Sequence, residues 1–284
     1  MDTVVIENKV ALATSPEGKQ ASLDLSVLMD RMMPAAMDTR SVVLPAGTKL
    51  LYTRGNSTIW VHETPPAIYG LKWIAPDSPV QFGAGTKYRI IRIGLPYVIV
   101  FCVFGVDPRG RPFLTSRNEC FFRTAPLSDA ETDELLYPAL LNCSKFPTED
   151  PNPLAWICTE HLDTTSLLRI ESTNQRMRES FKALMKCLLD SGFNRSSEGH
   201  EGASWFSETL KQGVDARIGS IERWQEETSR DPLFVLDVPW LKTGRTVAQM
   251  VERIFRLNHS PRAGIRSSAD IARIIFNTRQ KDAS

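Results

Sequence analysis

The sequence predicts an α+β protein, because patterns typical of strands come first and patterns typical of helices follow. Two observations carry this prediction. Between Ser41 and Arg123, short apolar segments alternate with turn residues, as in a meander of antiparallel strands. Between Asn174 and Asn277, apolar residues recur at helical spacing in several segments.

The predicted strands begin near the N-terminus. Val4–Ala13 has the pattern of a hairpin interrupted by Glu7-Asn8-Lys9, and Leu23–Met37 that of a weak helix. The meander comprises the predicted strands Lys49–Thr53, Ser57–Glu63, Ile68–Ile74, Lys87–Ile93, Leu95–Phe104 and Arg111–Arg123. Leu95–Phe104 is almost wholly apolar, which predicts a central strand covered on both faces. Asp107-Pro108-Arg109-Gly110 is the strongest turn signal in the chain.

Beyond Ala125 the pattern changes. Ser128–Glu131 could form one capped helical turn, and Tyr137–His161 is predicted as a loop. A helix over Asn174–Asp190 is indicated by an apolar stripe that Gly192 ends. The remaining expected elements are helices at Ser204–Lys211, Asp215–Thr228, Thr246–Leu257 and Ser268–Asn277, and a strand at Leu233–Val238. We therefore divide the chain into an appended segment (1–40), a core (41–195) and a mainly helical extension packed on it (196–284).

Composition narrows the class of protein. The chain has 284 residues, 42% apolar and 24% charged, and a net charge of +1, so its bulk charge favours neither nucleic acid nor membrane. From Leu241 to Ser284, nine cationic side chains face three acidic ones, a local net charge of +6. A solvated helical tail is the simpler interpretation; an acidic or nucleic-acid partner is the alternative. No export signal is visible and five cysteines occur, which predicts reduced thiols and a cytoplasmic protein.

Several common catalytic motifs are missing from the sequence. It has no phosphate-cradling glycine loop with its lysine, no GxSxG elbow and no HExxH. These absences argue against nucleotide hydrolysis, serine hydrolysis and the commonest zinc peptidases. We expect neither a bound cofactor nor a metal in this chain.

Cys158 is the strongest candidate for chemistry, in the stretch LLNCSKFPTEDPNPLAWICTEHL from Leu140 to Leu162. An exposed loop on a rigid scaffold is where reactive groups concentrate. A buried apolar thiol is the default alternative. Cys158-x-x-His161 is half of a zinc pattern, with Cys143 and His200 as distant candidates. A Cys–His protease would need its histidine on a separate element. The four histidines are His62, His161, His200 and His259, none in a recognisable context.

A further possibility is transthiolation, in which Cys158 accepts an acyl group from the thioester of another protein. A thioester is already activated, so the attacking thiol needs no strong neighbouring base. A side-chain amide on an adjacent loop would help by donating to the oxyanion when an amine attacks. Asn142 is one candidate for this donor and Asn152 is the other; both could instead simply form turns.

The order of these motifs resembles the prokaryotic ubiquitin-conjugating-like family that includes protein B of the PRTRC genetic system. The resemblance covers roughly 93–194 and rests on LPYVIVF, a Pro-Arg-Gly hairpin, DELLYPALLN, WIC and SGFN. In that family, Leu-Tyr-Pro and Leu-Pro-Asn precede an Ile/Val-Cys. Here Leu141 replaces the proline before Asn142, the segment from Asn142 to Cys158 is longer, and Thr159-Glu160 replaces a glycine. These departures weaken the assignment of Asn142 as the oxyanion donor more than the assignment of Cys158 as the nucleophile.

The resemblance implies a ubiquitin-conjugating-enzyme-like antiparallel β-meander packed on helices, with an N-terminal and a helical C-terminal extension. It implies that Cys158 is the thioester-forming residue and Asn142 its oxyanion donor. The implied partners are an adenylating activating enzyme, which would consume the ATP, a small ubiquitin-like protein and a deconjugating metalloprotease. A bacterial mobile element is the implied setting. Two alternatives remain: a non-catalytic scaffold of the same fold, and a plasmid-maintenance factor that binds nucleic acid through Arg253, Arg256 and Arg266.

Overall fold

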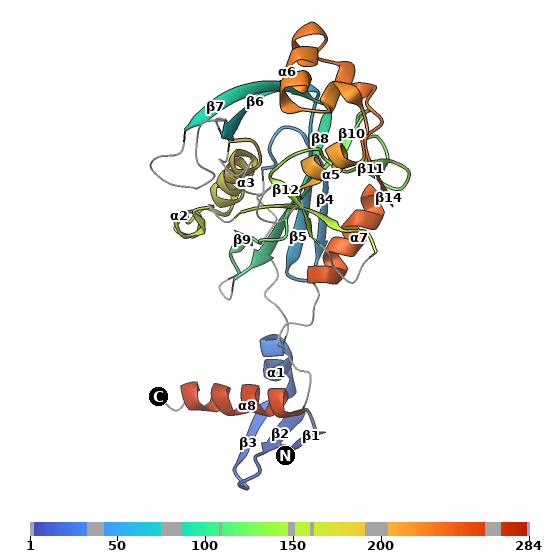
Figure 1. Cartoon of the computed structure of the whole chain (residues 1–284). Helices are drawn as coiled ribbons and strands as arrows, with labels where there is room; N and C mark the ends of the chain where they lie inside the picture. Colours follow the sequence, from blue (N-terminus) through green and yellow to red (C-terminus); the bar gives the residue numbers. More distant parts are fainter. Residues whose placement is uncertain are drawn as a thin grey trace. The chain divides into compact units, whose positions relative to one another are not determined.

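The computed structural model of the chain, drawn in Figure 1, describes residues 3–32, 43–74, 87–107, 110–146, 151–159, 162–190, 204–258 and 268–282. The chain forms two compact units. The smaller unit joins Met1–Ala36 to Phe255–Ser284, and the larger unit is Met37–Ile254. Both units combine antiparallel strands with helices, so the predicted α+β class is confirmed.

In the smaller unit, three antiparallel strands lie in the order β1 (Thr3–Glu7), β2 (Val10–Thr14) and β3 (Gln20–Asp24). The predicted hairpin is confirmed, with Asn8 and Lys9 in its turn at φ values of 47° and 65°. The predicted weak helix begins as β3, continues as α1 (Leu25–Met32), and its last residues lie outside the described ranges. Helix α8 (Ser268–Asp282) completes the unit. Its core consists of Ala11, Ala13, Ala21, Leu28, Ala272 and Ile275.

The larger unit is built on one curled antiparallel sheet. Along it lie β12 (Cys143–Phe146), β13 (Leu154–Ile157), β10 (Glu119–Arg123), β8 (Tyr97–Val106), β5 (Ser57–Thr64) and β4 (Thr48–Arg54), each paired with the next. Three short strands pair at its margins: β9 (Pro112–Leu114) with β8, and β11 (Glu134–Leu136) with β10 and β14 (Lys242–Thr246). Strands β6 (Ala67–Ile74) and β7 (Tyr88–Leu95) form a separate ribbon.

Strand β8 is the centre of this sheet. It pairs with β5 on one side and with β9 and β10 on the other, and after Tyr97 all its residues are buried. The predicted central strand covered on both faces is therefore confirmed. The segment predicted as one returning strand, Arg111–Arg123, is broken into β9 and β10 at Thr115–Asn118. Asn118 fills the break, accepting from the Val103 N–H (2.9 Å) and donating to the Thr115 carbonyl (2.6 Å).

Helices cover both faces of the sheet. Helix α3 (Thr173–Asp190), predicted within one residue, packs Phe181 on His62 of β5, with 4.4 Å between the ring centroids. Register pairs His62 with Val100 and Val100 with Cys120, so α3 lies on the Cys120 face of β10. Glu119 points to the opposite face, where it binds Arg253 of α7 (Val247–Asn258).

The other helices of the larger unit are α2 (Thr164–Leu168), α5 (Trp205–Lys211), the short 3-10 helix η1 (Ala216–Ile218) and α6 (Ile221–Arg230). Of these, α5 matches the predicted Ser204–Lys211, the predicted Asp215–Thr228 is divided into η1 and α6, and α2 was not predicted. Leu233–Val238 was predicted as a strand and holds the 3-10 helix η2 (Phe234–Leu236) instead. Phe234 and Val235 are both buried, so the apolar run fills the core without pairing to the sheet. Ser128–Glu131 forms a turn rather than a helix, because the Asp133 carboxylate binds the Ser128 and Asp129 N–H groups.

The structure divides the chain differently from the predicted boundaries at residues 40 and 195. The predicted N-terminal segment folds with α8, because Ala272 and Ile275 cover Ala11 and Ala13 of its sheet. The predicted C-terminal extension is split, since its part up to Ile254 belongs to the larger unit. Strand β14 pairs with β11 there and was not predicted.

Candidate functional site

The two residues predicted to carry chemistry flank one hairpin. Asn142 comes immediately before β12 and Cys158 immediately after β13. The first residue of β12, Cys143, pairs with the last of β13, Ile157. Asn142 and Cys158 therefore meet at the open end of the hairpin, and the Cys158 N–H donates to the Asn142 carbonyl oxygen over 3.3 Å.

The prediction of an exposed loop over Tyr137–His161 is wrong where Cys143–Phe146 and Leu154–Ile157 form strands and where the chain is buried. Strands β12 and β13 extend the sheet from β10, and the residues leading into the hairpin are buried. These buried residues are Leu140, Leu141, Asn142, Cys143 and Ser144. An apolar run whose backbone can pair with a partner strand gains both hydrogen bonds and burial, which outweighs the turn signal of its prolines. Glu160 and His161 lie outside the described ranges.

The Asn142 side chain turns toward α3. Its amide nitrogen donates to the carbonyl oxygen of Cys187, and its buried carboxamide oxygen has no hydrogen-bond partner in the part of the chain that the structure describes. The opposite amide orientation would set two oxygens against each other, so this assignment is the favourable one. One N–H of the amide thus fastens the hairpin to α3.

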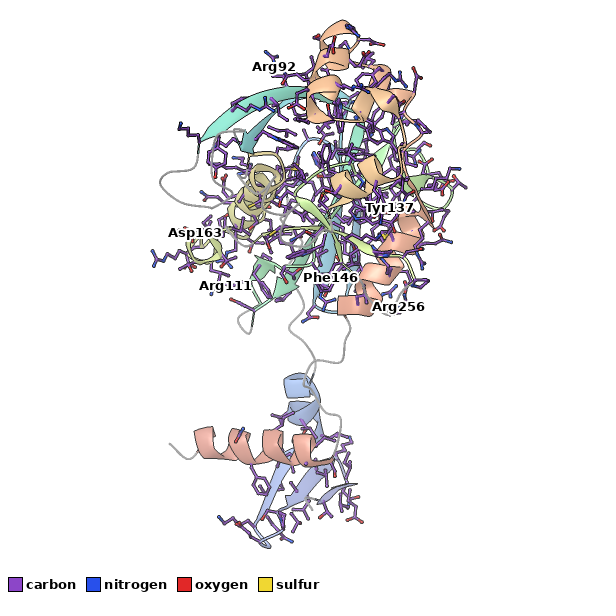
Figure 2. All side chains as sticks on the ribbon, viewed as in Figure 1. Arg92, Arg111, Tyr137, Phe146, Asp163 and Arg256 are labelled. Atoms are coloured by element: carbon purple, nitrogen blue, oxygen red, sulfur yellow. The ribbon has the colours of Figure 1, made fainter. Side chains whose placement is uncertain are left out.

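Asn152, the alternative oxyanion donor, lies at the other end of the hairpin. Its carbonyl oxygen accepts from Nη1 of Arg253 at 3.2 Å, and the carbonyl of Pro153 beside it accepts from the Tyr137 hydroxyl at 3.1 Å. The whole of β13 separates Asn152 from Cys158. Of the two asparagines, the structure brings only Asn142 next to Cys158. Figure 2 labels Phe146, the last residue of β12, and Tyr137, whose hydroxyl contacts the Asn152 end of the hairpin.

Cys158 differs from the other four cysteines in its exposure. All five lie in the described part of the chain, and Cys102, Cys120, Cys143 and Cys187 are buried whereas Cys158 is half-buried. Burial and the neighbouring Cys120 thiol raise the pKa of Cys143 far above its ordinary value. Burial also raises the pKa of Cys187, and the proximity of Cys158 adds to this rise. A low thiolate fraction makes buried cysteines poor nucleophiles, so Cys158 is the reactive candidate.

Two hydrogen bonds hold the residues just before Cys158 to the segment between β9 and β10. The Ile157 N–H donates to the carbonyl of Asn118 at 2.9 Å, and the Trp156 indole N–H donates to the carbonyl of Ser116. Both acceptors belong to the break between β9 and β10, which Asn118 itself stabilises. Asn118 and Cys187 help to position Cys158 and were not predicted from the sequence. The one signal that could have indicated Asn118 is that an asparagine stands just before the strand Glu119–Arg123.

The other predicted sites receive less support. His161 and His200, half of the possible zinc set, lie outside the described ranges, and the described residues contain no group of ligands suited to a metal ion. His259 also lies outside them. His62 is buried against Phe181, and burial lowers its pKa despite the opposing charge of Glu63. It belongs to the packing of the sheet.

The basic C-terminal residues are not a single surface. Arg253 is buried in an ion pair with Glu119, and their side chains are 0% and 3% exposed. Arg256, labelled in Figure 2, is exposed on α7, and Arg266 lies outside the described ranges. Arg253 must therefore be removed from the predicted nucleic-acid contacts, because its charge is already neutralised within the fold.

Comparisons with family models, with curated proteins and with solved structures gave no match to this chain. No helix in the described ranges is long and apolar enough to cross a lipid bilayer.

Proposed function

We propose that this protein carries an acyl group as a thioester on Cys158, in the manner of a ubiquitin-conjugating enzyme. The observation that carries the proposal is the position of this thiol. Cys158 is the half-buried cysteine of a chain whose other cysteines are buried, and it ends a hairpin fixed to both β10 and α3. A nucleophile on such a support can be reached from outside while its backbone stays in place.

The proposed reaction has two steps. The Cys158 thiolate attacks the carbonyl carbon of a donor thioester, and the donor thiolate leaves as the new C–S bond forms. An amine of the acceptor then attacks this carbonyl, loses its proton to solvent, and expels the Cys158 thiolate. The proposal assigns Asn142 chiefly to positioning, because its amide is bonded to the Cys187 carbonyl. The predicted oxyanion role would need the second N–H of the same amide.

We also propose that the larger unit has the fold of a ubiquitin-conjugating-enzyme-like meander, and its strand order supports this. In the sheet, β4 lies next to β5, β5 next to β8, and β8 next to β10, which is also their order along the chain. The β6–β7 ribbon is inserted in the sequence between β5 and β8. The hairpin bearing Cys158 and then helix α3 follow in the chain. The partners in this proposal are an adenylating enzyme, which would supply the donor thioester, and a small ubiquitin-like protein, with a metalloprotease that reverses the conjugation.

The test is reconstitution of the full chain with the candidate activating enzyme, ubiquitin-like protein and ATP. We expect an adduct on Cys158 that a reducing thiol removes. Cys158→Ser should give an adduct that resists the thiol, because an oxygen ester exchanges far more slowly, and Cys158→Ala should give none. Cys143→Ala is the matched control and should keep the adduct. An adduct that persists in Cys158→Ala and disappears in Cys143→Ala would show that Cys143 carries the acyl group, and it would contradict the proposal.

A non-catalytic scaffold of the same fold is the second candidate. It is favoured by one observation: the Asn142 amide already binds the Cys187 carbonyl. In that case the ubiquitin-like protein should bind reversibly and equally well to the wild type and to Cys158→Ala, with no covalent adduct. The nucleic-acid hypothesis predicts binding that weakens steeply with salt and depends on Arg256 rather than on Cys158.

A further inference from the structure

A pocket of about 390 Å³ is lined by residues of β9, α2 and α3 and of the segment that follows β9. Its volume is within the range of about 300–1,000 Å³ typical of small-molecule sites. Its lining combines apolar with polar side chains: Phe113, Leu114, Leu167 and Leu168, with Thr115, Ser116, Thr164, Arg176 and Ser180. Figure 2 labels Arg111, just before β9, and Asp163, which caps α2, on the elements that border it.

Arg176 gives this pocket an unbalanced positive charge. The residue is 1% exposed, and its guanidinium donates to backbone carbonyls, those of Ile170 and Pro112. A guanidinium has more N–H donors than these bonds use. The nearby Asp107 carboxylate is ion-paired with Arg111 at 2.9 Å rather than with Arg176. Buried charges are normally paired with an opposite charge, and no described carboxylate forms an ion pair with this one.

Burial lowers the pKa of Arg176, and the repulsion of Arg111 adds to this, against the attraction of Asp107 and Glu171. The direction of this shift agrees with the geometry: the surroundings do not fully compensate the cation. An anionic group in the pocket would supply the missing compensation.

The wall beside Arg176 also carries a polar atom without a partner. One helical turn further along α3, Ser180 lines the same pocket, and its buried hydroxyl has no hydrogen-bond partner in the described residues. Unpaired buried polar groups are uncommon in native proteins and call for a partner.

We propose that this pocket binds a small carboxylate with an apolar body. The apolar part would lie against Phe113, Leu114, Leu167 and Leu168, and the carboxylate would pair with the Arg176 guanidinium. Arginine matches a carboxylate in both charge and planar geometry. Thr115, Ser116 and Thr164 add hydroxyl groups to the lining. This site does not involve Cys158 and does not rest on the proposed thioester chemistry.

Titration calorimetry of the full chain with decanoate tests the proposal, with decanol as the uncharged analogue. Wild-type protein should bind decanoate saturably and decanol about tenfold or more weakly, because decanol lacks the charge-assisted hydrogen bonds to Arg176. Leu168→Trp should weaken decanoate binding at least as much, because Leu168 lines the pocket and is 41% exposed, so the larger ring can occupy the space without disturbing the core. Leu233→Trp, at a residue that is 53% exposed and outside the pocket, is the matched control and should bind normally.

Arg176→Gln should remove the preference for decanoate over decanol. If this variant does not fold, the comparison of the two ligands on wild type and on Leu168→Trp still decides. Equal affinity for decanoate and decanol, unchanged binding by Leu168→Trp, or no saturable binding of decanoate would each overturn the proposal. Cys158→Ser should bind decanoate as the wild type does, so a failure of the thioester chemistry and a failure of this site are distinguishable.

Discussion

The backbone N–H of Cys158 donates to the carbonyl oxygen of Asn142 over 3.3 Å, which joins the two ends of the β12–β13 hairpin. Because the Asn142 amide also binds the Cys187 carbonyl, one residue links the candidate nucleophile to helix α3. The position of Cys158 thus depends on the contact between Asn142 and Cys187, which are 45 residues apart in the sequence.

Replacing Asn142 tests this linkage. Asn142→Ala leaves the buried Cys187 carbonyl without its donor, and we expect a loss of about 1–3 kcal/mol in the free energy of unfolding. Asn142→Asp should cost more at neutral pH, because a carboxylate would face that carbonyl. Its pKa would be raised in the folded state, so the extra loss should grow as pH rises from about 4 to 7. Urea unfolding at both pH values measures this; a wild-type-like stability for Asn142→Ala would contradict the linkage.

Two neighbouring residues of α7 should differ sharply in their contribution to stability. Arg253 is fully buried with Glu119, whereas Glu252 forms an exposed pair with Arg54 at 2.7 Å. Arg253→Ala leaves the Glu119 carboxylate buried and uncompensated, which should cost about 3–5 kcal/mol. Glu252→Ala should cost about 1 kcal/mol or less. Denaturant unfolding of both variants provides the comparison, and equal losses would show that the buried pair is not the contact that holds α7.

The Asp133 carboxylate gives stability a specific pH dependence. Burial alone would raise its pKa, but hydrogen bonds from the N–H groups of Asp129 and Ser128, and the ion pair with Arg123 at 2.8 Å, produce a net lowering. A lowered folded pKa stabilises the protein above the ordinary value near 4, and this stability is lost as pH falls through the folded pKa.

Asp133→Asn should therefore be less stable than the wild type at pH 7, and the difference should shrink toward zero as pH falls below about 4. Thermal or urea unfolding across pH 2 to pH 7 measures the difference. A gap of the same size at every pH would mean that Asp133 acts through its shape and not through its charge.

Local patterns predicted much of the fold. The apolar run of β8 and the stripe of α3 are set by residues close together in the sequence, and both elements occur where expected. The packing of α8 on the N-terminal strands could not be predicted, because it depends on small residues such as Ala13 and Ala272, which do not form an apolar pattern in the sequence. Strand β14 was missed because LKTGRT has almost no apolar alternation and is ordered by pairing with β11.

The candidate site was only partly accessible to sequence reasoning. Cys158 and Asn142 were identified from the residues around them and from a family resemblance, and the hairpin brings them together. Their burial was predicted poorly, because Pro- and Asn-rich stretches normally indicate exposed turns. The roles of Cys187 and Asn118 depend on tertiary contacts with α3 and with the β9–β10 break, which no local pattern reports.

The central claim is that a bulky carrier can reach the Cys158 thiol in the folded protein. Brief labelling of the native chain with a polymer-linked maleimide, followed by peptide mass spectrometry, measures this directly. We expect one label on Cys158 under native conditions, and labels on Cys102, Cys120, Cys143 and Cys187 only after unfolding. If Cys158 is labelled no faster than these four buried cysteines, no partner can reach it, and the thioester function is excluded.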